Sequence, residues 1–334
     1  MEYDHQTRLT SAEMATLWGQ YVTETATRCV LQYFSATVEN PDIRSIIEAA
    51  LDATVENIKF LSGLFEMEDF PIPKGFTEDD VNLETPRLFS DLYFILNLKD
   101  MTIVQMSSQT LGIGLGSRSD VIGFHETLLY KNVRLQEKIK DVLLQKGLYI
   151  RPPYFSVPDQ VEFVTDQSFL GNLIGKQRPF TAVEISHLFL TTESNILGKE
   201  TQLGFAQAAK SEKVKNYFYR GKEIANKHIK ILKQVLIQDD LPATMPWDSA
   251  VTASTVPPFS DKLMMYLVSV LSATGIAKYG AAMGASPRKD IALKYARFLS
   301  EISLYAEDGA NIMIENGWLE EPPHAPDHDK LIKD

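Results

Sequence analysis

Cysteine is almost absent from this sequence, since Cys29 is the only one among 334 residues. A single cysteine excludes a disulfide bond within the chain and zinc sites of the multi-cysteine type. Proteins that form no disulfide are typical of reducing compartments. We therefore predict a cytoplasmic protein.

Positive charge is also scarce. The chain has 33 Lys and Arg residues against 44 Asp and Glu residues, and its net charge at pH 7 is −11. Nucleic acids and anionic membrane surfaces are both bound through concentrated basic residues. The charge balance therefore predicts that neither nucleic acid nor a membrane is a partner.

Long apolar runs are missing as well. The most apolar stretch, residues 263–276, contains Ser and Thr. It is shorter than the roughly 20 apolar residues that a membrane-spanning helix needs. Residues 1–10 are polar and lack the apolar centre of a signal peptide. The hydrophobic content of 44% is typical of a globular protein with a buried core.

The chain contains an internal duplication. The aligned positions lie 171 residues apart up to the loop near residues 76–85, and 170 residues apart after it. Chance similarity would not keep its register over this length, so we predict two copies of one fold. The matched segments are LTSAE at 9–13 with FTAVE at 180–184, Phe34 with Phe205, FSD at 89–91 with FSD at 259–261, and the Pro-Pro pairs at 152–153 and 322–323.

Each copy is expected to form four helices, because no segment shows the alternation of a half-buried strand. In the first copy, Thr10 or Ser11 together with Glu13 forms an N-capping signature, and Pro41 suits the first turn of the second helix. The fourth helix is expected to end at Gly147, since glycine favours the position after a helix. In the second copy, the predicted helices span residues 181–209, 212–238, 259–283 and 287–316.

The connection between the second and third helices of each copy is long. It covers about 15–20 residues, which allows the third helix to run parallel to the second, as in ferritin-like bundles. The predicted fold class is therefore all-α, with two tandem four-helix, ferritin-like bundles. We place them at residues 9–153 and 180–327, joined by a linker at residues 154–179 that is rich in Pro, Gly and aromatic residues.

Ferritin-like enzymes hold two metal ions with Glu-x-x-His motifs on two helices of one bundle. Only Glu184 and His187 have this spacing, and they lie in the opening turns of their helix. The corresponding Glu13 in the first copy is not followed by a histidine three residues later. A two-metal site is therefore not expected, and no cofactor is predicted.

A polar residue lies on an apolar helix face at the same position of both copies. His228 aligns with Asn57, and antiparallel pairing of the first two helices places Asn57 near Glu24 and His228 near Asn195. One interpretation is a remnant metal or ligand site. The other is a hydrogen-bonded polar pair that fixes the register of the core, since buried polar groups need partners.

The metal interpretation concerns the second bundle and a single ion. Its candidate ligands are Glu193, His228, His187 and Glu200. The two copies carry different residue types at this level, which argues against a shared catalytic role. The remaining helical histidine, His125, aligns with Tyr295 and is expected at a helix surface or boundary.

Three motifs carry a family resemblance: FSD at residues 89–91, KGLYIRPP at 146–153 and FSDKLMM at 259–265. They resemble an uncharacterised bacterial family, a domain of unknown function that is common in spore-forming Gram-positive bacteria and usually comes as two tandem copies. The resemblance covers residues 9–327 and implies a ferritin-like fold for each copy, with no established activity. Some spore-coat proteins resemble distant members of this fold group, which implies a link to sporulation. The family's Lys-His-Ile pattern is matched at 227–229, and the first copy departs from it.

Three functional hypotheses remain open. The favoured one is a non-catalytic structural or interaction protein, linked to sporulation or stress, that binds a protein partner or associates with itself in the cytoplasm or the spore. The second is a metal-binding or oxidoreductase protein with a degenerate ferritin-like site in the second bundle. The third is a small-molecule binder with a pocket between the bundles. The metal content of the purified protein separates the second hypothesis from the others.

Overall fold

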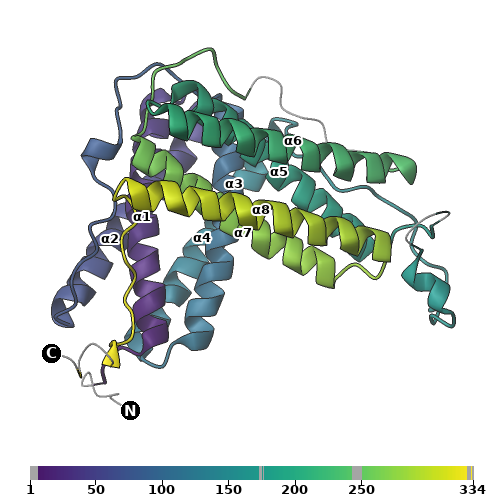
Figure 1. Cartoon of the computed structure of the whole chain (residues 1–334), viewed down its shortest axis with the longest axis horizontal. Helices are drawn as coiled ribbons and strands as arrows, with labels where there is room; N and C mark the ends of the chain where they lie inside the picture. Colours follow the sequence, from purple (N-terminus) through teal and green to yellow (C-terminus); the bar gives the residue numbers. More distant parts are fainter. Residues whose placement is uncertain (1–6, 173–174, 176, 243–249, 329–331, 333–334) are drawn as a thin grey trace. The chain divides into compact units, whose positions relative to one another are not determined.

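Eight α-helices make up most of the regular structure in the computed structural model, which describes residues 7–172, 175, 177–242, 250–328 and 332. Within these residues there is no extended strand, and isolated β-bridges occur instead, such as the one between Phe89 and Val251. The all-α fold class is therefore confirmed (Figure 1). The helices are α1 (Ser11–Thr37), α2 (Pro41–Met67), α3 (Asp91–Leu115), α4 (Ser119–Gln145), α5 (Ala182–Ala208), α6 (Glu212–Gln238), α7 (Asp261–Gly284) and α8 (Lys289–Glu315).

The first helix of each repeat begins at a capping box, as predicted for the first copy. The backbone N–H of Glu13 donates to Thr10 Oγ1 at 3.2 Å, and the backbone N–H of Thr10 donates to the Glu13 carboxylate at 2.8 Å. Thr181 and Glu184 make the same two bonds at 3.3 and 2.9 Å. Pro41 occupies the first turn of α2, where its missing N–H costs no helical hydrogen bond.

Hydrogen bonds between helices show the direction of each helix in the first repeat. Gln20 of α1 pairs with Gln109 of α3, and Glu13 pairs with Ser117 just beyond the end of α3. Helices α1 and α3 are therefore antiparallel. Helices α1 and α2 are also antiparallel, because only residues 38–40 join them. Helix α3 consequently runs parallel to α2, as the long connection between them allows.

The second repeat has the same order of directions. Lys227 pairs with Glu301 and Arg220 with Asp308, so α6 and α8 are antiparallel. Helices α7 and α8 are antiparallel because residues 285–288 join them, and α6 therefore runs parallel to α7. The two repeats thus form tandem four-helix bundles, which confirms the predicted architecture.

The chain divides into two compact units. The first turns of α3 belong to the second unit and its remainder to the first. The predicted borders at residues 9–153, 154–179 and 180–327 stay a prediction. The first unit comprises Met1–Leu83, Leu98–Val142 and Gly317–Asp334, and the second comprises Glu84–Asn97 and Leu143–Asn316.

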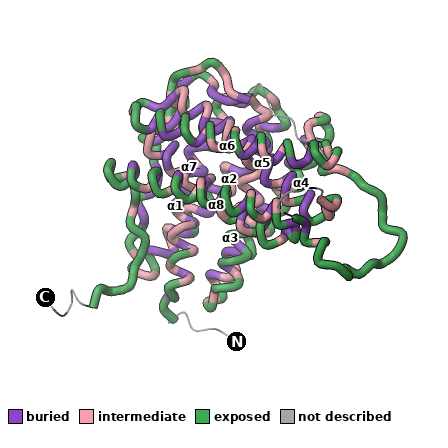
Figure 2. The backbone as a smooth tube through the Cα atoms, turned by 45° about the vertical axis from the view of Figure 1, so that its right-hand side comes forward, coloured by how far each residue is buried: buried purple, intermediate pink, exposed green. Residues whose placement is uncertain are grey.

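Aligned positions form the apolar core of both units, as Figure 2 illustrates by the buried residues that recur along the helices. Burial of these side chains supplies most of the folding free energy. In the first unit the cluster is Leu9, Leu17, Leu61, Leu64, Phe65, Val121, Phe124 and Leu128. In the second it is Leu188, Leu232, Val235, Leu236, Tyr279, Ala282, Ile291, Tyr295 and Phe298.

Helix α7 is the most apolar of the eight. Among the described residues it is the one helix long and apolar enough to cross a membrane, judged by length and composition only. It is longer than the apolar stretch at residues 263–276, because further helix-forming residues continue it to 24 residues. Leu263, Met265 and Tyr279 on this helix are buried in the second unit. The core helix of a soluble protein passes the same test, so the absence of a membrane partner stays a prediction.

Candidate functional site

A buried polar pair lies at mid-height of the first bundle, where the sequence predicted it. Asn57 Nδ2 of α2 donates to Glu24 Oε1 of α1 at 3.1 Å. Gln20, one turn earlier on α1, donates to the same oxygen at 2.7 Å. Burial raises the pKa of Glu24 to about 7, although the hydrogen bonds from Gln20 and Asn57 act in the opposite direction. Glu24 is thus a buried acid that changes its charge near neutral pH.

The polar pair extends across the bundle through two amides to a histidine. Gln109 Nε2 of α3 donates to Gln20 Oε1 at 2.9 Å, and His125 Nδ1 of α4 donates to Gln109 Oε1 at 2.6 Å. His125 is only 1% exposed, so its predicted place at a helix surface or boundary is wrong. Gly112 leaves room for the imidazole, because a Cβ there would lie 2.6 Å from Nε2. Burial lowers the pKa of His125.

The second bundle carries a different polar network at the same height. His228 Nδ1 lies 2.9 Å from the Tyr279 hydroxyl, which donates to Asn195 Oδ1 at 2.8 Å. His228 and Asn195 therefore share one level, as predicted, but Tyr279 connects them. His228 Nε2 donates to Glu301 Oε2 at 3.0 Å. Burial lowers the pKa of His228, and the neighbouring Glu301 opposes that effect.

The two networks use the same five aligned positions with different side chains. Each position on one repeat finds a partner on another helix of its own bundle, so the layer of polar contacts is kept while its chemistry changes. Well-connected networks of this kind favour a unique core packing, although Glu24 Oε2 and His125 Nε2 of the first bundle are buried without a partner in the described part of the chain. The aligned pairs are Gln20 with Thr191, Glu24 with Asn195, Asn57 with His228, Gln109 with Tyr279, and His125 with Tyr295.

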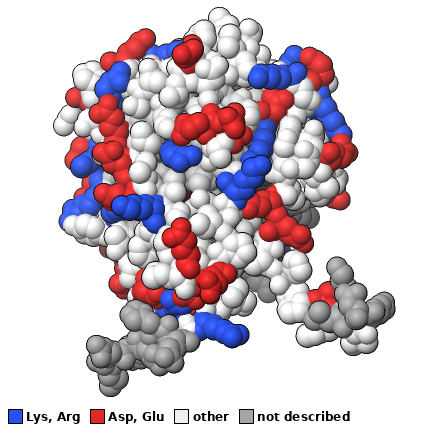
Figure 3. Space-filling model, turned by 90° about the vertical axis from the view of Figure 1, so that its left-hand side faces the viewer, with Lys and Arg blue, Asp and Glu red and all other residues white. Residues whose placement is uncertain are grey.

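An ion pair beside each network has exchanged its charges between the repeats. Glu56 of α2 pairs with Lys131 of α4 at 2.8 Å in the first bundle. At the aligned positions of the second bundle, Lys227 pairs with Glu301 at 2.7 Å. The exchange keeps the attraction between the second and fourth helices of each bundle. The fourth helix contributes the basic partner, Lys131, in the first bundle and the acidic partner, Glu301, in the second. On the face drawn in Figure 3, acidic and basic side chains are likewise interspersed.

The structure does not gather the predicted metal ligands into one group. Both ring nitrogens of His228 have hydrogen-bond partners, His187 is partly exposed near the start of α5, and Glu200 pairs with Lys199 at 3.1 Å. Within the part of the chain that the structure describes, no group of three His, Cys, Asp or Glu side chains could hold a metal ion. A metal at Glu193, His228 and His187 stays a prediction.

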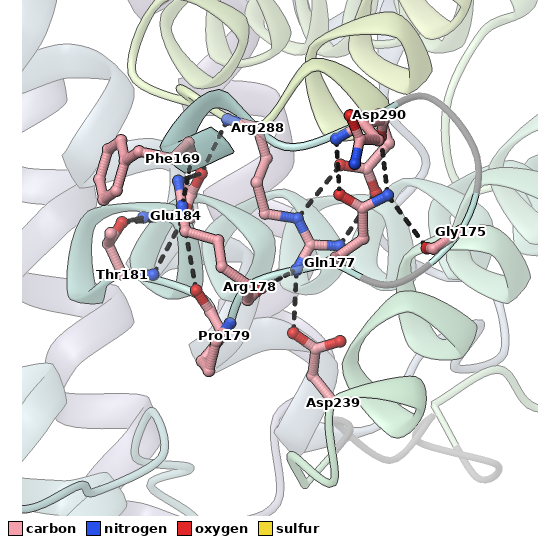
Figure 4. Close-up of polar contacts among 11 residues, drawn as sticks. Phe169, Gly175, Gln177, Arg178, Pro179, Thr181, Glu184, Asp239, Arg288 and Asp290 are labelled. Carbon is pink, nitrogen blue, oxygen red and sulfur yellow. Dashed lines mark hydrogen bonds and ion pairs between the residues drawn. The ribbon is translucent and has the colours of Figure 1, made fainter. Parts of the chain in front are cut away.

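A cluster of charged side chains, separate from the mid-bundle network, joins the helix ends of the second bundle (Figure 4). Arg288 Nη1 donates to Asp239 Oδ2 at 2.9 Å, and its Nη2 donates to Asp290 Oδ2 at 3.0 Å. The Glu184 carboxylate accepts from the Arg288 backbone N–H at 3.1 Å and pairs with Arg178 at 2.8 Å. The cluster therefore links the start of α5, the end of α6 and the start of α8.

The first bundle has a similar cluster, with Glu68 in place of Asp239 and Thr7 in place of Arg178. Arg118 pairs with Glu68 at 2.5 Å and with Asp120 at 2.7 Å, and its backbone N–H donates to Glu13 at 2.9 Å. Burial opposes the ionisation of Glu13, yet hydrogen bonds from neighbouring backbone and hydroxyl groups lower its pKa to about 2. Because the central arginine and its acidic partners recur in both repeats, we interpret the cluster as a clamp that holds the helix ends together.

Several of these residues were missed in the sequence. Tyr279 of α7 and Glu301 of α8 are the hydrogen-bond partners of His228. The pairing predicted from the sequence involves only the first two helices of each bundle, so residues on the third and fourth helices were not found. The duplication itself carries a usable signal, because positions 109 and 279 are polar in both copies, as are 125 and 295. A polar residue repeated on two aligned helix faces indicates a buried network.

Comparison with protein-family models agrees with the tandem organisation of the chain. The model of a family described as protein of unknown function (DUF3231) matches the chain twice, at residues 2–161 and 168–331, which confirms the predicted tandem family. Among solved structures, a candidate spore coat protein from Bacillus halodurans is similar, with 21% identity and a TM-score of 0.41. The match covers 45% of this chain and 98% of that chain. No curated protein matches the chain.

Proposed function

This chain belongs to the DUF3231 family of proteins of unknown function, and from that premise we propose that it is a non-catalytic interaction protein. The segment between the repeats, residues 154–164, binds a protein partner or a second copy of the chain. The polar layers of the two bundles serve packing in this proposal. The aligned positions are polar in both repeats, while their side chains and their hydrogen-bond pairs differ, which supports a structural role.

The observation that carries the proposal is the exposure of this segment (Figure 2). Six large apolar side chains within eleven residues are between 58% and 86% exposed. Contiguous exposed apolar surface is rare on soluble monomers and marks interaction sites. The acidic Asp159 and Glu162 among them favour a partner surface that combines apolar and basic groups. The six side chains are Tyr154, Phe155, Val157, Val161, Phe163 and Val164.

The test replaces three of these side chains in the full chain, as Tyr154→Ser, Phe155→Ser and Phe163→Ser combined. A matched control replaces three exposed apolar side chains on helices of the second unit, as Ile237→Ser, Leu293→Ser and Leu304→Ser. The measurements are sedimentation equilibrium for self-association and quantitative mass spectrometry of proteins retained from sporulating cells.

We expect one association, with a partner or with itself, that the segment variant loses and the control keeps. Thermal unfolding of the segment variant should match the wild type, because the replaced side chains contact little of the core. An unchanged set of retained proteins together with an unchanged oligomeric state would contradict the proposal.

Each bundle is proposed to be ferritin-like in its ancestry. The order of helix directions, with a long connection between the second and third helices, supports this class. The proposed place of action is the cytoplasm or the spore, and the link to sporulation comes from the sequence motifs. No resident cofactor forms part of the proposal.

The alternative function is a single metal ion bound in the second bundle. Its support is the adjacency of His228 and Glu301, since an imidazole and a carboxylate at 3.0 Å are both metal-ligand types. Their hydrogen bond competes with coordination, because the imidazole would have to give up Glu301 as an acceptor. Metal analysis of the purified protein decides between the two functions.

A further inference from the structure

A cavity of about 420 Å³ lies in the first unit beside Glu24. All four helices α1–α4 contribute to its walls. Leu31, Leu98 and Met101 provide apolar wall, and Asn57 and Asn132 provide amide groups. Its volume lies within the range of about 300–1,000 Å³ that is typical of small-molecule sites.

Glu24 lines this cavity with an oxygen that lacks a partner. Glu24 is only 1% exposed, and its Oε2 has no hydrogen-bond partner among the described residues, whereas Oε1 accepts from Gln20 and Asn57. The Thr54 hydroxyl, which also lines the cavity, lies close enough to the carboxyl to lower its pKa. A buried carboxylate oxygen without a donor is rare, because leaving it unsatisfied is unfavourable. Glu24 therefore brings one unsatisfied acceptor to the cavity wall. Oε2 is covered in this structure, so the carboxylate has to turn before a donor in the cavity can reach it.

The second repeat carries larger side chains at the positions that correspond to this cavity. Three lining positions of the first unit, Ala53, Leu128 and Asn132, align with Ile224, Phe298 and Ile302. Phe298 stacks on His228 at 4.1 Å between ring centroids. Ile302 packs so close to Gly275 that a Cβ there would lie 2.8 Å from its Cδ1. Larger apolar side chains thus occupy the corresponding region of the second bundle.

Glu24 is the one buried charge among the lining residues, and it indicates the sign of the ligand. Two of the three cations on α4 that line the cavity have acidic neighbours, since Lys131 pairs with Glu56 and Arg134 with Glu137, both at 2.8 Å. The third, Lys138, is exposed to solvent. The inner end carries Glu24, which can only accept hydrogen bonds when ionised. A charged donor is the strongest complement to a buried carboxylate. An ammonium group meets this requirement, whereas an anion would be repelled.

We propose that the first unit binds a small amphiphilic amine, whose ammonium group donates to Glu24 Oε2 and whose apolar body lies along Leu31, Leu98 and Met101. The ligand stands where the second repeat places its larger apolar side chains. Because the pKa of Glu24 is about 7, binding strengthens as the pH rises from 6 to 8 and the carboxylate ionises. The affinity of a neutral analogue stays constant over this range.

The test measures binding of hexylamine to the full chain by titration calorimetry, with 1-hexanol as the neutral analogue. Three variants are compared with the wild type. Glu24→Gln removes the acceptor charge, and the double variant Ala53→Ile with Asn132→Ile fills the cavity as the second repeat does. Asp52→Asn is the matched control, because Asp52 is an exposed acid at the opening. Thermal unfolding establishes that each variant is folded.

We expect saturable one-to-one binding of hexylamine that is weakened by about tenfold or more in Glu24→Gln and lost in the filled variant. Asp52→Asn should keep the affinity within about twofold, as expected for a screened surface charge. Hexanol should bind about tenfold or more weakly than hexylamine. The proposal is overturned if hexylamine binding to the wild type does not saturate, or if the filled variant binds hexylamine as tightly as the wild type. It is also overturned if the wild type binds hexanol as tightly as hexylamine and Glu24→Gln keeps the wild-type affinity for hexylamine.

Discussion

Glu24→Gln is expected to remove a pH dependence from the stability of the first unit. The folded protein raises the pKa of Glu24 from its ordinary 4.5 to about 7, because burial disfavours the charged carboxylate. Between these two values the folded state holds a proton that the unfolded chain has released. The free energy of unfolding therefore falls as the pH rises through this window.

The size of the effect follows from the two pKa values. A difference of one in pKa between the folded and unfolded states corresponds to about 1.4 kcal/mol of stability. The rise of the Glu24 pKa from 4.5 to about 7 therefore corresponds to about 3 kcal/mol in the free energy of unfolding. Glutamine keeps an oxygen to accept from Gln20 and Asn57 but carries no charge at any pH. The stability of the variant relative to the wild type should therefore increase by about 3 kcal/mol between pH 4.5 and pH 8.

Urea unfolding followed by tryptophan fluorescence measures this difference. Trp18 and Trp318 both belong to the first unit, and Trp247, which lies outside the described residues, is replaced by Phe in both proteins. A stability difference that stays constant within about 1 kcal/mol from pH 4.5 to pH 8 would refute the reasoning. It would mean that Glu24 is solvated or has a donor in the folded protein.

Three further predictions concern the other polar contacts. His228→Ala should lower the free energy of unfolding by about 1–3 kcal/mol, because it leaves Tyr279 and Glu301 without the imidazole; an unchanged urea midpoint would contradict a packing role. Arg288→Leu should destabilise the second unit by about 3 kcal/mol, since it leaves two carboxylates unpaired at the helix ends; calorimetry checks this, and a loss below about 0.5 kcal/mol would exclude the clamp. His125→Gln should reduce the loss of stability below pH 6.5, because burial lowers the pKa of His125 and only the unfolded chain gains its proton there; identical melting curves of the two proteins at pH 5 would contradict it.

Much of the fold could be predicted because its signals are local or repeated. The capping boxes at Thr10 and Thr181 lie where the sequence patterns place them, and the duplication carries every helix from one copy to the other. The proximity of Glu24 and Asn57 could be predicted because the short turn between α1 and α2 leaves little freedom in the register of these two antiparallel helices.

The hydrogen-bond partners on the third and fourth helices could not be predicted, because a long connection does not fix the register of these helices against the first two. The partners of His228 come from α7 and α8, whose register against α6 is set by packing rather than by a short turn. The cavity was also beyond sequence reasoning, because its existence depends on small differences in side-chain volume, such as Ala53 against Ile224. The burial of His125 depends in turn on the space left by Gly112 on another helix.

The metal content of the purified full chain tests the central claim most directly, namely that the mid-bundle polar layer of the second bundle serves packing and holds no metal ion. Mass spectrometry of the wild type and of His228→Ala, prepared without chelators, gives the number of metal ions per chain. The account predicts less than about 0.1 metal ion per chain in both proteins, because His228 is engaged by Tyr279 and Glu301. About one ion per wild-type chain that is absent from His228→Ala would contradict it.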